Sequence, residues 1–277
     1  MSDVIKFRMK RLLWIGMLLI SLGAKAQFDA AFTNSWALQS YFNPAAAGVD
    51  GLLNVRAAYS LQMLGFENAP KTMLITADMP LFFLGPQHGV GLGLYNDKAG
   101  VFNTQKISLT YAYHMKLWGG TMSISARPAL FVEKTDGSNL DLIHTNDPAF
   151  TTSDAKGQAL DLDFGLRYTY KKLWYAGASV MHMMGQTISL GDEKKQEVTV
   201  DPVIYLTGGY RYKMRYPRYA LAMDAILRSD LQNWRGDITA RLEYDGEKHK
   251  LYGGIMYTTI NSVGILQGYI FHGINIG

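Results

Sequence analysis

Residues 159–170 read ALDLDFGLRYTY, and this stretch decides the fold. Leucine, phenylalanine and tyrosine alternate with aspartate, glycine, arginine and threonine along it. A strand points successive side chains to opposite faces and so separates these two sets, whereas a helix would scatter both around its surface. Residues 107–115 and 237–244 alternate in the same way. The pattern therefore predicts β-strands with one apolar and one polar face.

About twelve segments of the chain read as such strands. They centre on residues 52–61, 72–80, 88–96, 104–115, 119–132, 159–170, 173–184, 201–213, 217–228, 235–245, 248–259 and 266–277. Most have the roughly 9–11 residues that a tilted strand needs to cross a bilayer. No convincing amphipathic helix lies between them, so we expect an all-β fold.

The connections between these strands alternate in length, which favours a transmembrane antiparallel β-barrel in an outer membrane. The short ones are residues 81–87, 116–118, 171–172, 214–216 and 245–247, and the longer ones include residues 133–158 and 185–200. A soluble β-sandwich is the alternative, but its solvent-facing sides are usually rich in lysine, glutamate and threonine. Aromatic residues also stand near strand ends, where interfacial girdles would lie. They are Tyr111, Tyr113, Tyr168, Tyr170, Trp174, Tyr175, Tyr210, Tyr212, Tyr219, Tyr244 and Tyr252.

The first 26 residues have the three parts of a secretory signal peptide. Lys6, Arg8, Lys10 and Arg11 precede an apolar core at residues 12–22, and Ala24-Lys25-Ala26 gives a small-x-small cleavage site. A short anchor helix is the alternative, but the apolar run is too short to span a bilayer. We therefore expect residues 1–26 to be a cleavable leader for Sec export and residues 27–277 to form the barrel. The start codon stays open between Met1 and Met9.

Composition excludes several classes of function. Of the 27 basic and 23 acidic residues, five basic and one acidic fall in the leader, which leaves 22 of each and no cationic surplus for nucleic acid. The absence of cysteine excludes disulfides, thiolate metal sites and cysteine nucleophiles. The six histidines are dispersed, and none pairs at zinc-ligand spacing. We expect no cofactor, no metal and no catalytic constellation. An outer-membrane hydrolase could use His144, in the longest loop, but the polarity of a solvated loop explains this histidine better.

Residues 40–81 read SYFNPAAAGVDGLLNVRAAYSLQMLGFENAPKTMLITADMPL and resemble the opening of the PorP/SprF family of type IX secretion system membrane proteins. That family typically has an Asn-Pro-Ala-Tyr-Ala-Gly box, a strand ending in Arg-x-Gln-Trp, and a Gly-Phe-x-x-Ala-Pro-x-Thr turn. The positions that match are Asn43, Pro44, Ala45, Ala47 and Gly48 in the box, Gln62 at the strand end, and Gly65, Phe66, Ala69, Pro70 and Thr72 in the turn. Ala46, Ser60 and Met63 depart from the usual tyrosine, arginine and tryptophan.

The resemblance implies a non-enzymatic outer-membrane component in Bacteroidota, coupled to type IX secretion components and to secretion or surface anchoring of large adhesin-type proteins. In motile relatives it implies a part in gliding motility. Family members usually continue past this C-terminus, so we expect about two further strands, fourteen in all, an even number suited to a closed barrel. An outer-membrane pore or transporter for small or hydrophobic solutes is the alternative function.

Two sets of residues are candidates for functional sites. The first would bind secretion partners, although Asn43 to Gly48 could equally be only the turn into the first strand; it comprises Asn43, Pro44, Gly48, Gln62, Gly65, Phe66, Pro70 and Thr72. The second is expected to face the lumen as a network of paired charges, with a selective channel lining as the alternative. Its members are Asp78, Arg127, Asp161, Asp163, Arg167, Asp224, Arg241 and Glu243.

Overall fold

The computed structural model describes residues 32–84, 87–136, 155–190, 196–246, 249–271 and 274–277. The expected leader, His144 and the centre of the longest predicted loop lie outside these residues.

The described residues are almost entirely β-structure, and thirteen strands form a single antiparallel sheet. Those strands are β1 (Asn54–Leu61), β2 (Lys71–Pro80), β3 (His88–Ala99), β4 (Phe102–Leu117), β5 (Gly120–Thr135), β6 (Ala155–Tyr170), β7 (Trp174–Met181), β10 (Val203–Lys213), β11 (Tyr219–Ser229), β12 (Trp234–Asp245), β13 (His249–Thr258), β14 (Ser262–Phe271) and β15 (Ile274–Ile276). A separate hairpin pairs β8 (Thr187–Leu190) with β9 (Gln196–Thr199). The helical turns are η2 (Ser35–Ala37), α2 (Gln39–Phe42), η3 (Pro44–Ala46) and η4 (Phe82–Leu84).

The all-β prediction is confirmed, and each of the twelve predicted segments overlaps a strand of the sheet. Three details differ. Strands β4, β5 and β6 each run for 16 residues, longer than a bilayer alone requires. The last predicted segment is divided between β14 and β15, and the connection predicted at residues 185–200 contains the β8–β9 hairpin.

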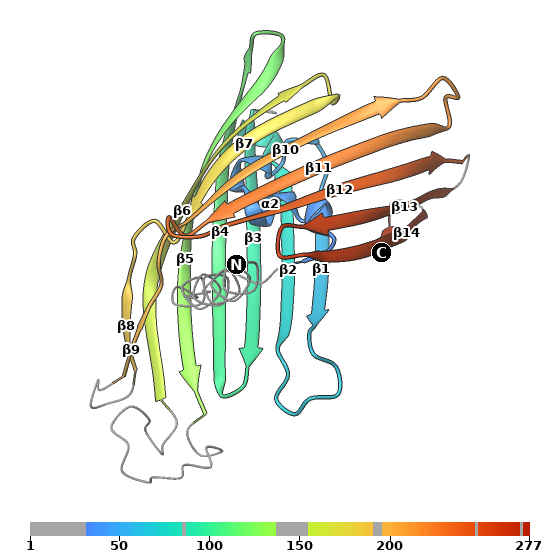
Figure 1. The fold of residues 1–277 in the computed structure, drawn as a ribbon. Coiled ribbons are helices and arrows are strands. Elements are labelled where there is room, and N and C mark those ends of the chain that lie inside the picture. Colours follow the sequence, from blue (N-terminus) through green and yellow to red (C-terminus); the bar gives the residue numbers. More distant parts are fainter. Residues whose placement is uncertain (1–31, 85–86, 137–154, 191–195, 247–248, 272–273) are drawn as a thin grey trace, which may run out of the picture.

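The sheet curves strongly, so that β10 to β13 pass across the face of β1 to β4 (Figure 1). Every strand pairs with its neighbours along the chain, and β7 pairs with β10 across the inserted hairpin. At the two ends of the strand order, β1 pairs only with β2 and β15 only with β14 among the described residues. The structure therefore has the curvature of a barrel with two unpaired edges.

The outer face of the sheet is apolar and the inner face is polar, which inverts the usual arrangement of a soluble protein. On β6, Leu160 is 67% exposed while Asp163 is fully buried. On β4, Ile107 and Leu109 are exposed while Lys106 is buried. Strands of transmembrane barrels alternate in this way because one face meets lipid and the other meets the lumen. No helix within the described ranges is both long and apolar enough to cross a membrane.

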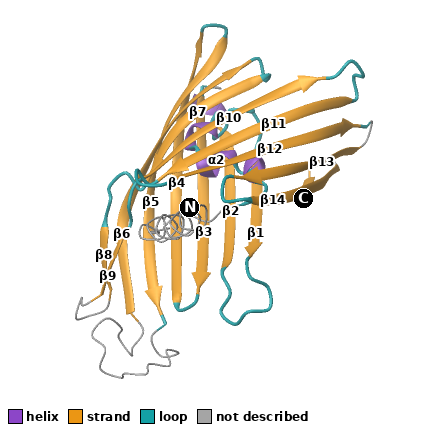
Figure 2. Cartoon of the chain, viewed as in Figure 1, coloured by secondary structure: helices purple, strands orange, loops and turns teal. Residues whose placement is uncertain are grey.

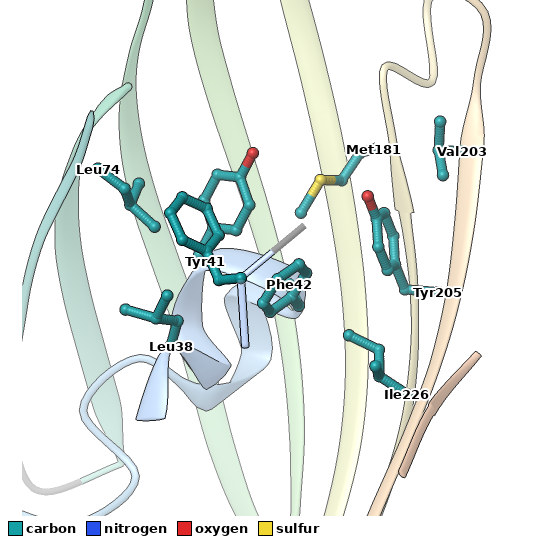
Figure 3. Close-up of a cluster of buried hydrophobic side chains, with 9 residues drawn as sticks. Leu38, Tyr41, Phe42, Leu74, Met181, Val203, Tyr205 and Ile226 are labelled. Atoms are coloured by element: carbon teal, nitrogen blue, oxygen red, sulfur yellow. The ribbon is translucent and has the colours of Figure 1, made fainter. Parts of the chain in front are cut away.

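Residues 32–50 lie inside the curve of the sheet, and we call them the luminal segment. Figure 2 shows their helical turns enclosed by the strands. The largest apolar cluster forms around them: Leu38, Tyr41 and Phe42 pack against side chains of β2, β7, β10 and β11 (Figure 3). Those side chains are Leu74, Met181, Val203, Tyr205 and Ile226. Because this cluster ties together opposite walls of the sheet, the segment is part of the core.

Candidate functional site

The Asn-Pro box at the centre of the luminal segment is buried against β6 and β7. The Asn43 side chain donates to the carbonyl oxygens of Leu166 (2.9 Å) and Ala178 (3.4 Å) and accepts from the backbone N–H of Ala45 (3.0 Å). Ser179 adds a bond to the carbonyl of Phe42 at 2.6 Å. Pro44 begins the short helical turn that follows, where its fixed φ and missing N–H cost nothing. These bonds fix the segment to the sheet.

Glycines in the strands make room for this contact. A Cβ at Gly165 would collide with the Asn43 amide oxygen, and one at Gly177 would lie 2.6 Å from its nitrogen. A Cβ at Gly89 would collide with the carbonyl oxygen of Ala47, the same oxygen that lies 3.0 Å from His114 Nε2. Glycine within a strand often marks the close approach of another backbone, and here that backbone is the luminal segment.

The box ends at Gly48, which the wall of the sheet also holds. Its φ of +72° lies in the left-handed region, and a Cβ would come within 2.9 Å of the Gly89 Cα. The Gly48 N–H donates to the Asp78 carboxylate at 3.0 Å, and that carboxylate also pairs with Arg56. Positive φ and close packing both require glycine at this position.

A cluster of buried charges lies beneath the segment on β4, β5 and β6. The Asp163 carboxylate accepts from Lys106 (2.9 Å), Arg127 (2.6 Å) and the backbone N–H of His182 (2.9 Å). Asp161 pairs with Lys106 at 3.1 Å and with His182 at 2.6 Å. Arg127 reaches on to the carbonyl of Tyr41 at 2.8 Å. The cluster is therefore also an anchor for the luminal segment.

Asp161, Asp163 and His182 offer ligand atoms close enough together to hold a metal ion. Lys106 and Arg127 already supply two positive charges to the two carboxylates. A cation would have to displace these partners, so the arrangement is better suited to a neutral ion-pair network.

A second group of charges, on β6, β11 and β12, contacts the start of the luminal segment. Arg241 pairs with Asp224 at 2.8 Å, and its guanidinium lies 3.6 Å from the centre of the Trp36 ring. Arg167 donates to the Gln39 amide at 2.8 Å. Arginine stacks on aromatic rings and pairs with carboxylates at once, which makes it effective at such contacts. Both arginines thereby connect the segment to the wall.

The eight residues expected in the lumen all lie on the inner face. Asp78, Arg127, Asp161, Asp163, Arg167 and Arg241 are buried, Asp224 is 11% exposed and Glu243 is 23% exposed. Several of their partners were not predicted from the sequence, namely Arg56, Lys106, His182 and Arg211. The alternation of residues 107–115, extended by one residue toward the N-terminus, would have placed Lys106 on the inner face of β4. Nothing in the sequence marks His182, which contacts the cluster from just beyond the end of β7.

Two of the expected girdle aromatics also face inward. The Tyr175 hydroxyl donates to Asp224 at 2.8 Å, and Tyr252 packs edge-on against Trp36. Their neighbours Trp174 and Leu251 take the outward positions. The alternation reverses with every residue, so a strand-end position alone does not decide which face an aromatic side chain takes.

The expected partner-binding residues do not form one site. Asn43, Pro44 and Gly48 lie in the buried luminal segment, and Thr72 is buried with its hydroxyl 2.6 Å from Asp97. Gln62, Gly65 and Phe66 are exposed in the connection between β1 and β2, and Phe66 has 74% of its surface exposed. Pro70 is half-buried, and its carbonyl accepts from the Gln62 N–H at 3.1 Å. The β1–β2 connection thus exposes the Phe66 side chain, and the Gln62–Pro70 hydrogen bond closes the base of the connection.

The chain also matches a family model. The model describes the type IX secretion system membrane protein PorP/SprF, and it matches residues 24–277. The chain belongs to the PorP/SprF family. No curated protein matches the chain. PorP/SprF proteins are membrane proteins of a secretion system, which agrees with a sheet whose apolar face points outward. The resemblance of residues 40–81 is thereby confirmed, and the match extends it over the remaining strands.

Proposed function

We propose that this PorP/SprF protein is a non-enzymatic docking component of the outer membrane, which holds secreted adhesin-type proteins at the cell surface through its longer loops. Its expected signal peptide would deliver it there by Sec export. The observation that carries the proposal is the exposed Phe66 on the β1–β2 connection, at the same end of the sheet as the connection between β5 and β6. A large aromatic side chain on a surface loop is typical of the anchors that dominate protein interfaces.

The luminal segment supports docking over the alternative of a solute pore. It crosses the interior and is held by hydrogen bonds to β6 and β7 and by packing against β2, β10 and β11. A wide pore needs an open aqueous path, and porin-type barrels provide one. We therefore expect the purified protein to give no wide, steady conductance in a planar bilayer.

The docking role is tested by affinity capture of the tagged full-length protein from detergent-solubilised outer membranes, with mass spectrometry of the proteins that come with it. We expect type IX secretion components and a large adhesin-type protein. Phe66→Ser should reduce recovery of the adhesin-type protein by removing the anchor. Phe83→Ser is the matched control, because Phe83 is equally exposed but lies in the short β2–β3 connection at the opposite end.

Two results would overturn the proposal. One is recovery of the barrel with neither kind of partner. The other is a steady, wide conductance from the wild-type protein, which would favour the pore.

A further inference from the structure

The connection between β2 and β3 exposes three large apolar side chains in a row. Phe82, Phe83 and Leu84 form the helical turn η4, and Phe83 has 82% of its surface exposed. Residues 79–87 read MPLFFLGPQ and contain no charged side chain. A contiguous exposed apolar group of this kind marks a surface that another apolar partner covers. We call these three residues the apolar turn.

The exposure of the apolar turn does not come from an open edge of the sheet. Strand β2 pairs with both β1 and β3, and β3 pairs with both β2 and β4. The backbone at the base of the turn is hydrogen-bonded as well, because the Leu81 N–H donates to the carbonyl of His88 at 2.7 Å. The Leu84 N–H donates to the carbonyl of Leu81 at 3.2 Å. The side chains, and not unpaired main-chain groups, are what the turn offers to a partner.

Strand register places the apolar turn beside the end of β4. The pairing of β3 with β4 reaches Tyr113, and β4 then continues for four more residues, to Leu117. The His114 N–H donates to the carbonyl of Gln87 at 2.6 Å, so the connection runs alongside this part of β4. Because His114 points inward, Tyr113, Met115 and Leu117 take the outward positions.

These outward residues show that the apolar outer face extends to the level of the apolar turn. On the neighbouring strands Met115 is opposite Met122 of β5, and Met122 is opposite Tyr168 of β6. The outward residues of a transmembrane barrel are apolar where they meet lipid, and tyrosine is enriched where they meet the headgroups. Strands β4 to β6 therefore reach the membrane interface at the level where β2 and β3 are joined by the apolar turn.

The composition of the connection favours lipid over a protein partner. A protein interface combines apolar contacts with a polar rim and about one hydrogen bond per 100–200 Å². In residues 79–87 the one polar side chain is Gln87. The apolar turn also continues the lipid-facing side of β2, because Met79, on the last outward position of that strand, is exposed like the turn itself.

We propose that Phe82, Phe83 and Leu84 insert into the lipid bilayer at its interface and anchor the β2–β3 connection there. Lipid would cover the apolar surface that water otherwise meets, and removing such surface from water is favourable. The anchor goes beyond the proposed function and does not rest on docking at Phe66, which lies at the other end of the sheet.

The anchor also bears on the luminal segment. The connection begins directly after the pair formed by Pro80 and Gly89. Gly48, which ends the Asn-Pro box, packs against Gly89 and the carbonyl of Met79. An anchored apolar turn would hold this part of the wall at a fixed depth in the bilayer.

The test uses the full-length protein, in which single cysteines can be placed because the chain has none. Phe83→Cys is labelled with nitrobenzoxadiazole and reconstituted into phosphatidylcholine vesicles at a high ratio of lipid to protein. We expect the label to emit at a shorter wavelength than it does in water. We also expect strong quenching by phosphatidylcholine that carries a nitroxide near the top of its acyl chain. Phe82→Cys, labelled in the same way, should behave alike and is an independent measurement.

The matched control is Lys172→Cys with the same label, in the exposed β6–β7 connection at the same end of the sheet. Its label should emit at a longer wavelength and be quenched less by the nitroxide lipid. Labels at Phe82 and Phe83 that match the control in emission and quenching would overturn the proposal. So would labels that are shielded from water in native outer membranes but not in vesicles of lipid alone, which would assign the turn to a protein partner. None of these measurements involves Phe66, so failure here is distinguishable from failure of docking.

Discussion

At the scale of single residues, Asn43 is the most informative side chain, because it forms hydrogen bonds with carbonyl groups of β6 and β7 and with an N–H of its own turn. Asn43→Ala would leave the carbonyl of Leu166 and the N–H of Ala45 without these partners inside the sheet. Unsatisfied buried polar groups cost about 1–3 kcal/mol. We expect the free energy of unfolding in urea to fall by about that amount. Gln232→Ala, in an exposed turn, is the control and should change it little.

Asp163 belongs to the same scale, since one carboxylate balances two buried cations. Asp163→Asn would leave Lys106 and Arg127 without this anion, and breaking a buried pair in this way costs about 3–5 kcal/mol. The melting temperature in detergent should fall clearly. Asp245→Asn, which breaks an exposed pair with Lys250, should cost about 0–1 kcal/mol. Similar losses in the two variants would contradict a structural role for the buried cluster.

Gly89 tests whether the fit of the luminal segment depends on the absence of a side chain. Gly89→Ala should displace the segment, because the new methyl group would meet the carbonyl of Ala47. Gly253→Ala is the control, since a Cβ there would find only one neighbouring atom, at 3.9 Å. Protease cleavage within residues 32–50 should accelerate in the first variant alone.

At the scale of elements, the β8–β9 hairpin is a separate unit that rests on long strands. Ile188 and Leu190 pack against Phe131 of β5 and Ala155 of β6, apart from the main cluster. Removing a buried isoleucine side chain costs about 2–5 kcal/mol. Ile188→Ala should therefore release the hairpin to proteolysis while the melting temperature of the main sheet changes little. Thr187→Ala, at an exposed position of the same strand, should leave proteolysis unchanged.

The elements also show how far the sequence could predict this molecule. Strands with strict alternation were the easiest to predict, because one pattern determines both faces; β6 was predicted to its last residue, Tyr170, but residues 155–158 were assigned to the connection before it. The luminal segment was not predicted as such: residues 39–46 form short turns whose burial comes only from contacts with distant strands. Gly89, Gly91 and Gly93 alternate along one strand, which suits either strand curvature or the close approach of another segment, but a sequence cannot name the segment that approaches. The β8–β9 hairpin was missed because its two strands have only four residues each.

At the scale of the whole molecule, the proposed docking role places the β1–β2 connection outside the cell and the β6–β7 turn, at the other end of the sheet, in the periplasm. The chain has no cysteine, so single cysteines can be introduced without background. Phe66→Cys should react with a membrane-impermeant maleimide on intact cells. Lys172→Cys should react only after the outer membrane is permeabilised. The reverse pattern would invert the orientation and place the β6–β7 turn at the cell surface.

The position of the luminal segment has a consequence for assembly. The segment comes before every described strand, yet its partners include Ser179 and Tyr205, more than 130 residues later. Its hydrogen-bonding groups therefore stay unsatisfied until β7 and β10 have joined the sheet. Contacts so distant in sequence form slowly. Burial of Asn43 would then indicate that the sheet has curved around the luminal segment. The cell could distinguish a finished barrel from an unfinished one by whether residues 32–50 are still accessible.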